Sequence, residues 1–293
     1  MRVALCLSGY FNSLKDLTSR GMDGYDHIQR KILSKRQEGH TIDVFFHNWE
    51  PDSEQLLVEL YNPKKYIVEN QIDFDMIAKE NGVDRSSIDP HGQLGSWTVN
   101  SQSGVGYVGP ERILSQFYSV QKSMELKREY EKEHNFKYDC VIKSRFDLGR
   151  INRDTSGPGR INPYACQCIN FEPEQDMNFL YVANWDLFNE GPADMWYYSS
   201  SENMDNFCEL YNNALHEYMK PNSEFQKKIT SGWIESKLNE FRTNELFKPK
   251  EEQAKLLHKY PPHMICNAIL LQKWFLIECG LWEKMKPLDT EWE

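Results

Sequence analysis

Four short apolar runs, with room for a helix or a loop between neighbours, constrain the fold of this chain most. They occupy residues 3–7, 43–47, 66–69 and 140–145. Runs that stay apolar instead of alternating with polar residues are typical of strands buried on both faces, as in parallel sheets with helical crossovers. The sequence therefore predicts an α/β fold with a mainly parallel, Rossmann-like sheet flanked by helices.

The segments between these runs carry helix signals. Helices are expected over residues 22–37, 51–60 and 111–134, and the last has apolar residues near helical spacing. A shorter helix is expected after Asp73, which is a suitable N-cap, with a stop at Gly82. Residues 92–109 are rich in Ser and Gly and are expected to form a loop.

The second half of the chain is less regular. Residues 151–178 predict loops with room for a hairpin, and short strands are expected over 179–182 and 196–199. Helices are expected over 202–219, in parts of 222–255, and near 263–279. Since no repeat or linker is apparent, we expect one domain over residues 1–293, with halves at 1–150 and 151–293.

Composition excludes several classes of partner and location. The chain has 34 basic and 44 acidic residues, a net charge of −10, whereas nucleic-acid binding needs a basic face. No segment reaches the ~18 apolar residues of a membrane span. The apolar part of the N-terminus is too short for a secretory signal, and the seven cysteines are scattered. We expect a cytoplasmic protein with free thiols and no nucleic-acid partner.

Three strand ends are candidate binding sites, because ligands of open α/β sheets bind beyond the carboxyl ends of the strands. The first is LSGYFNS, where Ser8 and Gly9 could offer backbone amides, although a plain tight turn also explains them. The second is HNWE at residues 47–50, which also fits a strand end with a packed tryptophan. The third is SRFD at residues 144–147.

In SRFD, an apolar strand ends in Arg145 and Asp147, whose side chains should share one side while Phe146 packs on the other. One carboxylate is enough to propose a Mg²⁺ or Mn²⁺ site completed by phosphate oxygens. A surface ion pair or a helix cap is the structural alternative. The literal D-x-D at residues 73–75 opens a polar helix, and capping explains Asp73 without a metal.

The order of these motifs resembles a known family. VALCLSGYFNS, DVFFHNW, QFYSVQKSMELKREYE, YDCVIKSRFD and ADMWYYSSSENMDNF follow one another as in GT-A-type glycosyltransferases of bacterial and viral surface-glycan synthesis. The resemblance covers about two thirds of the chain. It implies a GT-A-like fold and a transferase that moves a sugar from a UDP- or GDP-sugar donor to a glycan or glycoprotein acceptor. Residues 1–150 would bind the donor and residues 151–293 the acceptor, and a viral enzyme of this family would act in the host cytoplasm.

The resemblance also implies site residues. Ser8, Gly9 and Asn12 would line the nucleotide, and Arg145 and Asp147 would hold the diphosphate and a Mn²⁺ or Mg²⁺ ion. The candidates for the catalytic base are Asp194 and, second, His263, for which a helix-start role is the structural alternative. Further donor contacts are expected from one face of the helix over 111–134, the alternative being a solvated face; they are Gln116, Ser119 and Lys122.

Two other functions remain open at this stage. The first is a non-catalytic module that binds a nucleotide or a glycan on the same fold. The second is another nucleotide-dependent transferase, such as a sulfotransferase, but the sequence contains no Gly-rich phosphate loop ending in Lys-Ser or Lys-Thr.

Overall fold

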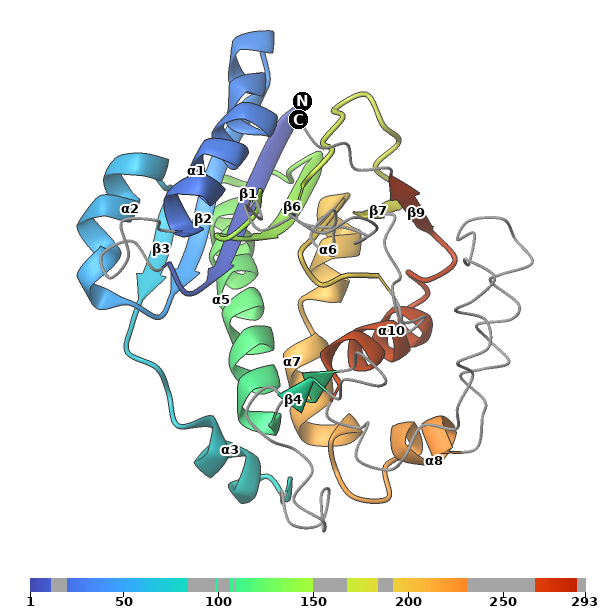
Figure 1. Cartoon of the computed structure of the whole chain (residues 1–293). Coiled ribbons are helices and arrows are strands. Elements are labelled where there is room, and N and C mark those ends of the chain that lie inside the picture. Colours follow the sequence, from blue (N-terminus) through green and yellow to red (C-terminus); the bar gives the residue numbers. More distant parts are fainter. Residues whose placement is uncertain are drawn as a thin grey trace, which may run out of the picture.

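The computed structural model describes residues 1–11, 20–83, 98–99, 106–107, 109–149, 168–183, 192–230 and 267–288. Within these ranges seven strands form one sheet in the order β3-β2-β1-β6-β8-β7-β9, and two further strands form a separate pair (Figure 1). The strands of the sheet are β1 (Arg2–Gly9), β2 (Thr41–Asn48), β3 (Lys65–Val68), β6 (Cys140–Arg145), β7 (Leu180–Ala183), β8 (Trp196–Ser199) and β9 (Met285–Leu288). Only β8 runs antiparallel to its neighbours β6 and β7. The predicted α/β fold with a mainly parallel sheet is confirmed.

Helices connect and cover these strands. The α-helices in the described part are α1 (Arg20–Lys31), α2 (Glu54–Tyr61), α3 (Phe74–Glu80), α5 (Pro110–His134), α6 (Ser201–Phe207), α7 (Leu210–Asn213), α8 (Glu224–Thr230) and α10 (Ala268–Glu278). Short 3₁₀ segments are η1 (Leu33–Glu38) and η2 (Pro51–Ser53), and η4 (Ala214–Tyr218) is a π-helical turn. None of the described helices is long and apolar enough to cross a lipid bilayer.

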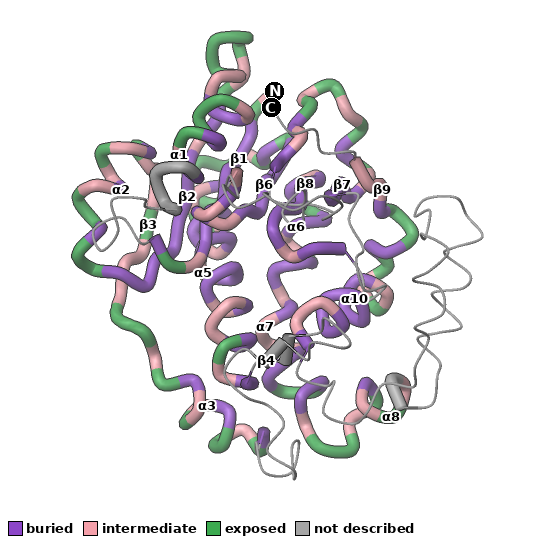
Figure 2. Tube along the Cα trace, in the orientation of Figure 1, coloured by how far each residue is buried: buried purple, intermediate pink, exposed green. Residues whose placement is uncertain are grey.

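Each face of the sheet has its own hydrophobic core. Alternate residues of β1 divide between the two faces, so that Ala4 and Cys6 meet α5 while Leu5 and Leu7 meet the side of α1 and α2. Figure 2 shows buried chain along the strands and along the sheet-facing part of α5. The strands are apolar along their length because both of their faces are covered.

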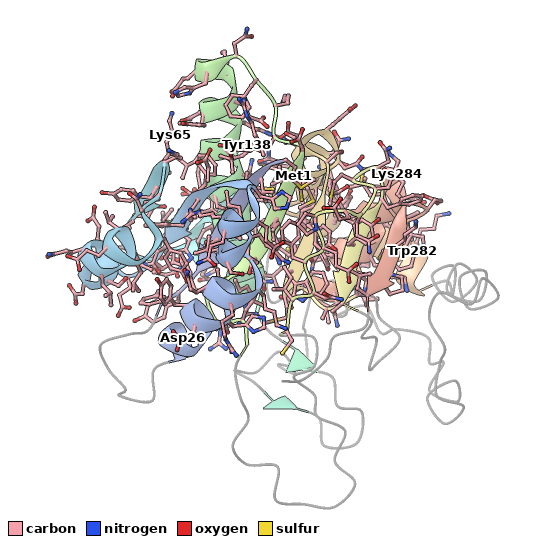
Figure 3. The ribbon with its side chains drawn as sticks, turned by 90° about the horizontal axis from the view of Figure 1, so that it is seen from above. Met1, Asp26, Lys65, Tyr138, Trp282 and Lys284 are labelled. Carbon is pink, nitrogen blue, oxygen red and sulfur yellow. The ribbon has the colours of Figure 1, made fainter. Side chains whose placement is uncertain are left out.

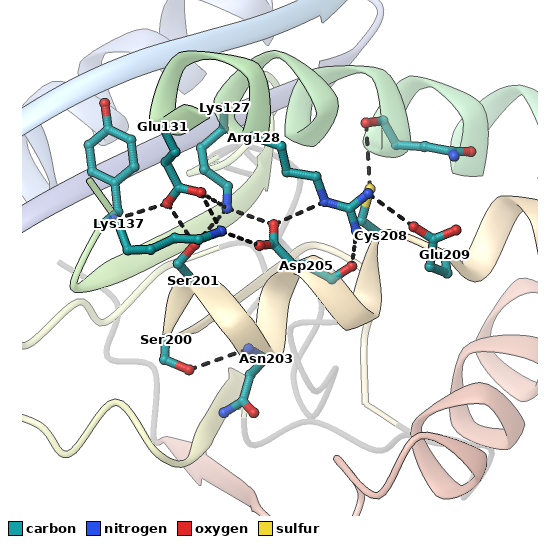
Figure 4. A network of polar contacts seen from close by, with 12 residues as sticks. Lys127, Arg128, Glu131, Lys137, Ser200, Ser201, Asn203, Asp205, Cys208 and Glu209 are labelled. Atoms are coloured by element: carbon teal, nitrogen blue, oxygen red, sulfur yellow. Dashed lines mark hydrogen bonds and ion pairs between the residues drawn. The ribbon is translucent and has the colours of Figure 1, made fainter. Parts of the chain in front are cut away.

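A buried ionic network joins α5 to α6 (Figure 4). Lys127 is fully buried, and its Nζ lies 3.1 Å from Glu131 Oε2 and 2.7 Å from Asp205 Oδ1. Ser201 donates to Glu131 Oε1 at 2.7 Å, and Lys137 contacts both carboxylates at 2.9 Å. Burial, the largest influence, raises the pKa of Glu131, but these hydrogen bonds and charges outweigh it and hold that pKa below its usual value. The network fixes α5 against the second half of the chain.

The helix predicted over residues 202–219 is interrupted. α6 ends at Phe207, and α7 and η4 follow after a turn. The guanidinium of Arg128 donates to the backbone oxygen of Asp205, and the amide of Glu209 bonds to Asn206 O instead, at 3.2 Å. A continuous helix needs the Asp205 oxygen for the amide of Glu209, so this side chain, remote in sequence, explains the break.

Two pieces of sheet were not predicted. β9 contains Pro287 and pairs in parallel with β7 at the sheet edge, the position where a strand tolerates a missing N–H donor. Inside the expected loop 92–109, β4 (Thr98–Val99) and β5 (Gly106–Tyr107) pair antiparallel. Residues 168–178 contain no strand, and residues 151–167, the rest of the region expected to hold loops or a hairpin, lie outside the described residues.

Candidate functional site

The candidate site lies at the carboxyl edge of the parallel strands. β1, β2, β3 and β6 end at this edge, with Ser8 beside Arg145 in register, and the antiparallel β8 begins there, with Trp196 beside Ser144. Asp194 therefore reaches this edge from the second half of the chain. Figure 3 looks down on the opposite, amino edge, where Met1 and Lys65 mark the starts of β1 and β3.

Arg145 and Asp147 form a two-point ion pair at the end of β6. The guanidinium Nε donates to Asp147 Oδ1 at 2.8 Å, and Nη2 lies 2.7 Å from Oδ2. Their side chains are 36% and 26% exposed, so a ligand can reach both. Phe146 between them is buried, which confirms the predicted alternation of the three side chains.

The turn that carries Asp147 is held by close packing. The Phe146 ring lies edge-on to Phe11 and Phe46, with centroids 5.7 and 6.0 Å apart. Gly24 on α1 lies so near that an added Cβ would sit 1.8 Å from the Phe146 carbonyl oxygen. Because this backbone has little freedom to shift, the position from which the Asp147 side chain extends is set before any ligand binds.

Asp194 joins the same cluster. Its Oδ2 accepts a hydrogen bond from the Gln116 amide on α5 and lies 3.8 Å from Arg145 Nη1. Its backbone oxygen accepts from the Lys143 ammonium. Three predicted site residues (Arg145, Asp194 and Gln116) are thus in direct contact, although up to 78 residues separate them in the chain. Arg145 lies between two carboxylates, those of Asp147 and Asp194.

Lys143 is a member of this cluster that the sequence reasoning missed. It lies two residues before Arg145 on the same face of β6, is 1% exposed, and lies 5.2 Å from the centroid of the Tyr197 ring. Burial lowers its pKa from 10.5 to about 8; Asp194 opposes this shift, while Arg145 adds to it. A lysine inside an otherwise apolar strand is the signal that would have found it, since such a charge stays buried only beside partners.

A second polar chain crosses the ends of β1 and β2. The Gly9 amide donates to Ser119 Oγ at 2.8 Å, and Ser119 lies 2.8 Å from His47 Nδ1. His47 Nε2 lies 3.0 Å from Glu69 Oε1. Burial, the largest influence, lowers the pKa of His47 although Glu69 acts in the opposite direction, so a neutral ring accepts from Ser119 and donates to Glu69.

The contacts of Ser119, His47 and Glu69 resemble those of a hydrolase triad, but a substrate cannot reach the serine. Ser119 is 0% exposed, and its oxygen already accepts from Gly9. A nucleophile must reach the substrate, so we interpret the chain as a brace between α5 and the ends of β1 and β2. Ser119 and the Gly9 amide, both expected to contact a nucleotide, are engaged with one another.

The other expected donor contacts have local partners. Ser8 is buried, with Oγ 3.4 Å from Ser144 O, and Lys122 lies 2.8 Å from Glu125 Oε2 and beside the Tyr118 ring. Gln116 and Ser119 have different partners: Gln116 donates to Asp194, in the segment before β8, whereas Ser119 contacts Gly9 of β1 and His47 of β2. Asn12 and His263 lie outside the described residues.

The D-x-D segment has a structural role. Asp73 caps α3 by accepting from the Met76 amide at 3.0 Å, and Asp75 pairs with Lys79 at 2.5 Å. The interpretation of Asp73 as a helix cap is confirmed. These two carboxylates line an open pocket of about 340 Å³ between the starts of α3 and α5, which Arg145 and Asp147 do not line.

The carboxylates at the candidate site fit a metal that arrives with its ligand. No group of three or more His, Cys, Asp or Glu side chains in the described part of the chain could by itself hold a metal ion. Asp147 and Asp194 nevertheless flank one guanidinium, at 2.7 and 3.8 Å. Mg²⁺ binds through one or two carboxylates plus phosphate oxygens and waters, so this pair suits a metal–diphosphate and not a resident all-protein site.

The comparisons with known proteins do not name the family. No protein-family model matches this chain, and no curated protein matches its sequence. The argument for function therefore rests on the residues at the carboxyl edge.

Proposed function

We propose that this protein is a glycosyltransferase that moves a sugar from a nucleoside-diphosphate donor, a UDP- or GDP-sugar, to a glycan or glycoprotein acceptor. The observation that supports it is the convergence of Arg145, Asp147 and Asp194 at the carboxyl edge, where open α/β sheets bind ligands. The order of the sequence motifs, which resembles GT-A-type enzymes, supports the same activity. We also propose a cytoplasmic location.

Each residue of the cluster has a role in this proposal. Arg145 binds the diphosphate, since a guanidinium offers paired donors to phosphate oxygens. Asp147 holds the divalent cation, Mn²⁺ or Mg²⁺, which when bound neutralises charge on the leaving diphosphate. Asp194 accepts the proton of the attacking acceptor hydroxyl. Gln116 and Lys143 position Asp194 through its carboxylate and its backbone oxygen.

Ligand binding has to rearrange the Arg145–Asp147 pair, because both Asp147 oxygens accept from the guanidinium. A diphosphate provides new acceptors for Arg145 and releases Asp147 at the same moment. Before the donor binds, the ion pair therefore keeps the Asp147 carboxylate and the Arg145 guanidinium in place. In this scheme, donor and metal bind cooperatively.

The proposal is tested with a panel of nucleotide sugars in the presence of Mn²⁺, by donor hydrolysis and by the thermal shift that nucleoside diphosphates cause. Asp147→Asn should reduce turnover at least 100-fold and leave the unliganded melting temperature near that of the native protein. Asp73→Asn is the matched control, since asparagine also caps helices, and it should keep full activity.

Three results separate the possibilities. Loss of activity in Asp73→Asn but not in Asp147→Asn would move the metal site to the D-x-D segment. Nucleotide binding without hydrolysis or transfer on any acceptor would favour a non-catalytic module, the alternative function. No thermal shift with any nucleoside diphosphate would reject the proposed function itself.

A further inference from the structure

The open pocket between the starts of α3 and α5 has no part in the proposed chemistry. Its volume is about 340 Å³, which lies within the usual range of sites for small ligands. α5 meets the end of β1 at Ser119 and runs from there toward the amino edge, so its first turns extend beyond the carboxyl edge (Figure 1). The pocket therefore lies on the side of the sheet where ligands of such folds bind.

The walls of this pocket are fixed before any ligand binds. Gln71 Nε2 donates to Ser115 Oγ at 2.9 Å, which ties the segment before α3 to α5. The buried ring of Phe74, which also lines the pocket, lies edge-on to Trp49 and Tyr118, with centroids 5.8 and 5.4 Å apart. A preformed pocket loses little free energy to ordering when a ligand binds.

Arg112 and Gln71 give the pocket both donors and acceptors. In the part of the chain that the structure describes, the exposed guanidinium of Arg112 forms no hydrogen bond or ion pair, so its N–H donors can meet a ligand. The amide oxygen of Gln71 can accept, because only its Nε2 bonds to the protein. Hydroxyl groups both donate and accept, so this lining suits the several hydroxyls of a sugar ring.

The charge of the lining disfavours anions. The carboxylates of Asp73, Asp75 and Glu111 line the pocket together with one guanidinium, that of Arg112. Asp73 and Asp75 are engaged as the cap of α3 and as the partner of Lys79, so they contribute charge and not ligand contacts. A phosphate or a uronate would be repelled there, whereas a neutral ligand with many hydroxyls would not.

α5 connects this pocket to the proposed catalytic base. Arg112 and Gln116 lie one helical turn apart on the same face, ~6 Å along the axis. The Gln116 amide donates to Asp194. A ligand held by Arg112 is therefore close to the hydroxyl that Asp194 would activate, but it does not occupy the same position. That separation suits a chain whose end reacts beside Asp194 while a preceding unit binds in the pocket.

We propose that this pocket binds a neutral sugar unit of the acceptor glycan, behind the unit that receives the transferred sugar. The inference rests on the proposed function, because it describes the acceptor of the same reaction. It makes the acceptor an oligosaccharide that is uncharged near its reacting end. It also places part of the acceptor site in residues 1–150, whereas the family resemblance assigns the acceptor to residues 151–293.

Initial rates with saturating donor and Mn²⁺ test this on glucose, mannose, galactose and N-acetylglucosamine and on the di- to tetrasaccharides of each. The best oligosaccharide should exceed its monosaccharide about 10-fold in kcat/KM, the range of a hydrogen bond from a charged donor. Arg112→Ala should raise KM for that oligosaccharide about 10-fold and leave KM for the monosaccharide unchanged. Donor hydrolysis without acceptor should stay at the native rate, because the pocket lies apart from Arg145 and Asp147.

Two controls accompany this variant. Arg30→Ala removes an exposed arginine from α1, on the other face of the sheet from α5, and should keep the oligosaccharide preference. Oligosaccharides with glucuronate next to the reacting unit should be about 10-fold poorer acceptors than their neutral counterparts, since the carboxylate would lie among the acidic side chains.

The results distinguish this inference from the proposed function. An oligosaccharide preference that is absent, that survives Arg112→Ala or that favours glucuronate would overturn the inference, and normal donor hydrolysis would leave the transferase standing. If no sugar of the panel is an acceptor, saturation-transfer NMR with the same oligosaccharides decides: signals that Arg112→Ala removes would support the pocket, and none would overturn it. Absence of both donor hydrolysis and nucleotide binding would reject the proposed function itself.

Discussion

Replacing the buried Lys143 by methionine gives the sharpest physical test of the candidate site. Its ammonium is enclosed between β6, β8 and α5, and burial lowers its pKa from 10.5 to about 8. Lowering the pKa from 10.5 to about 8 corresponds to roughly 3 kcal/mol of free energy. The folded protein therefore holds a cation at neutral pH at a cost of about 3 kcal/mol relative to the unfolded chain.

The sign of the pH dependence follows from this. Below pH 8 Lys143 is charged in both states, so the native protein and Lys143→Met should differ by a constant free energy of unfolding. Between pH 8 and 10.5 the unfolded chain binds the proton and the folded protein does not, so the native protein should gain stability relative to the variant as pH rises. The gain should total roughly 3 kcal/mol and level off above pH 10.5.

Urea denaturation of both proteins at intervals from pH 7 to 11 measures this difference directly. Other groups that titrate in this range cancel between the two proteins to first order. Lys79→Met, which removes an exposed lysine from α3, is the control for loss of a lysine alone. A difference that stays flat within ~0.5 kcal/mol over the whole range, about a third of one pKa unit's worth of change, would refute the argument that Lys143 is a desolvated cation.

Three further substitutions test interactions that stabilise the fold, and each is measured by urea denaturation. Gly24→Ala should destabilise the fold by ~2 kcal/mol or more, because its Cβ would overlap the Phe146 carbonyl, and unchanged stability would show that the turn can shift. Glu131→Gln should cost about 3 kcal/mol by leaving the Lys127 cation less paired, and a cost below ~1 kcal/mol would contradict the tethering role of the network. Asn267→Ala should cost ~1 kcal/mol, because its side chain caps α10 by accepting from two amides, and no loss would show that the cap is dispensable.

Local sequence signals were enough for strands β1, β2, β3 and β6 and for helices α3 and α5, but not for the short pair β4–β5. The strand at residues 140–145 agrees with β6 at both ends, and Asp73 caps α3 as its position before a polar helix indicated. These elements are set by apolar runs and capping residues that act over a few positions. The break after α6 could not be found in the same way, because it depends on Arg128, 77 residues away from Asp205.

The residues of the candidate site show the same contrast between local sequence signals and contacts with distant parts of the chain. Arg145 and Asp147 could be proposed from the sequence because the end of a buried strand is a local signal, and side-chain alternation placed both on one side of Phe146. The engagement of Ser119 with Gly9 and His47 was not foreseen, since helical spacing shows which residues share a face and not which neighbour that face meets. Lys143 was passed over for a related reason: it lies inside the strand, and only the structure places the Asp194 backbone oxygen beside it.

The antiparallel strand β8 explains how the two halves of the chain meet at one site. If β8 were parallel to β6, its first residues would lie at the amino edge of the sheet. Asp194 would then lie at the opposite edge from Arg145. Because β8 runs the other way, the segment before β8 arrives where β6 ends, and Ser144 pairs with Trp196. The direction of β8 thus places the Asp194 carboxylate beside the Arg145 guanidinium of β6. Any rearrangement that weakened the β6–β8 pairing would separate Asp194 from Arg145 and Lys143 before it disturbed the parallel pairing of β1, β2, β3 and β6.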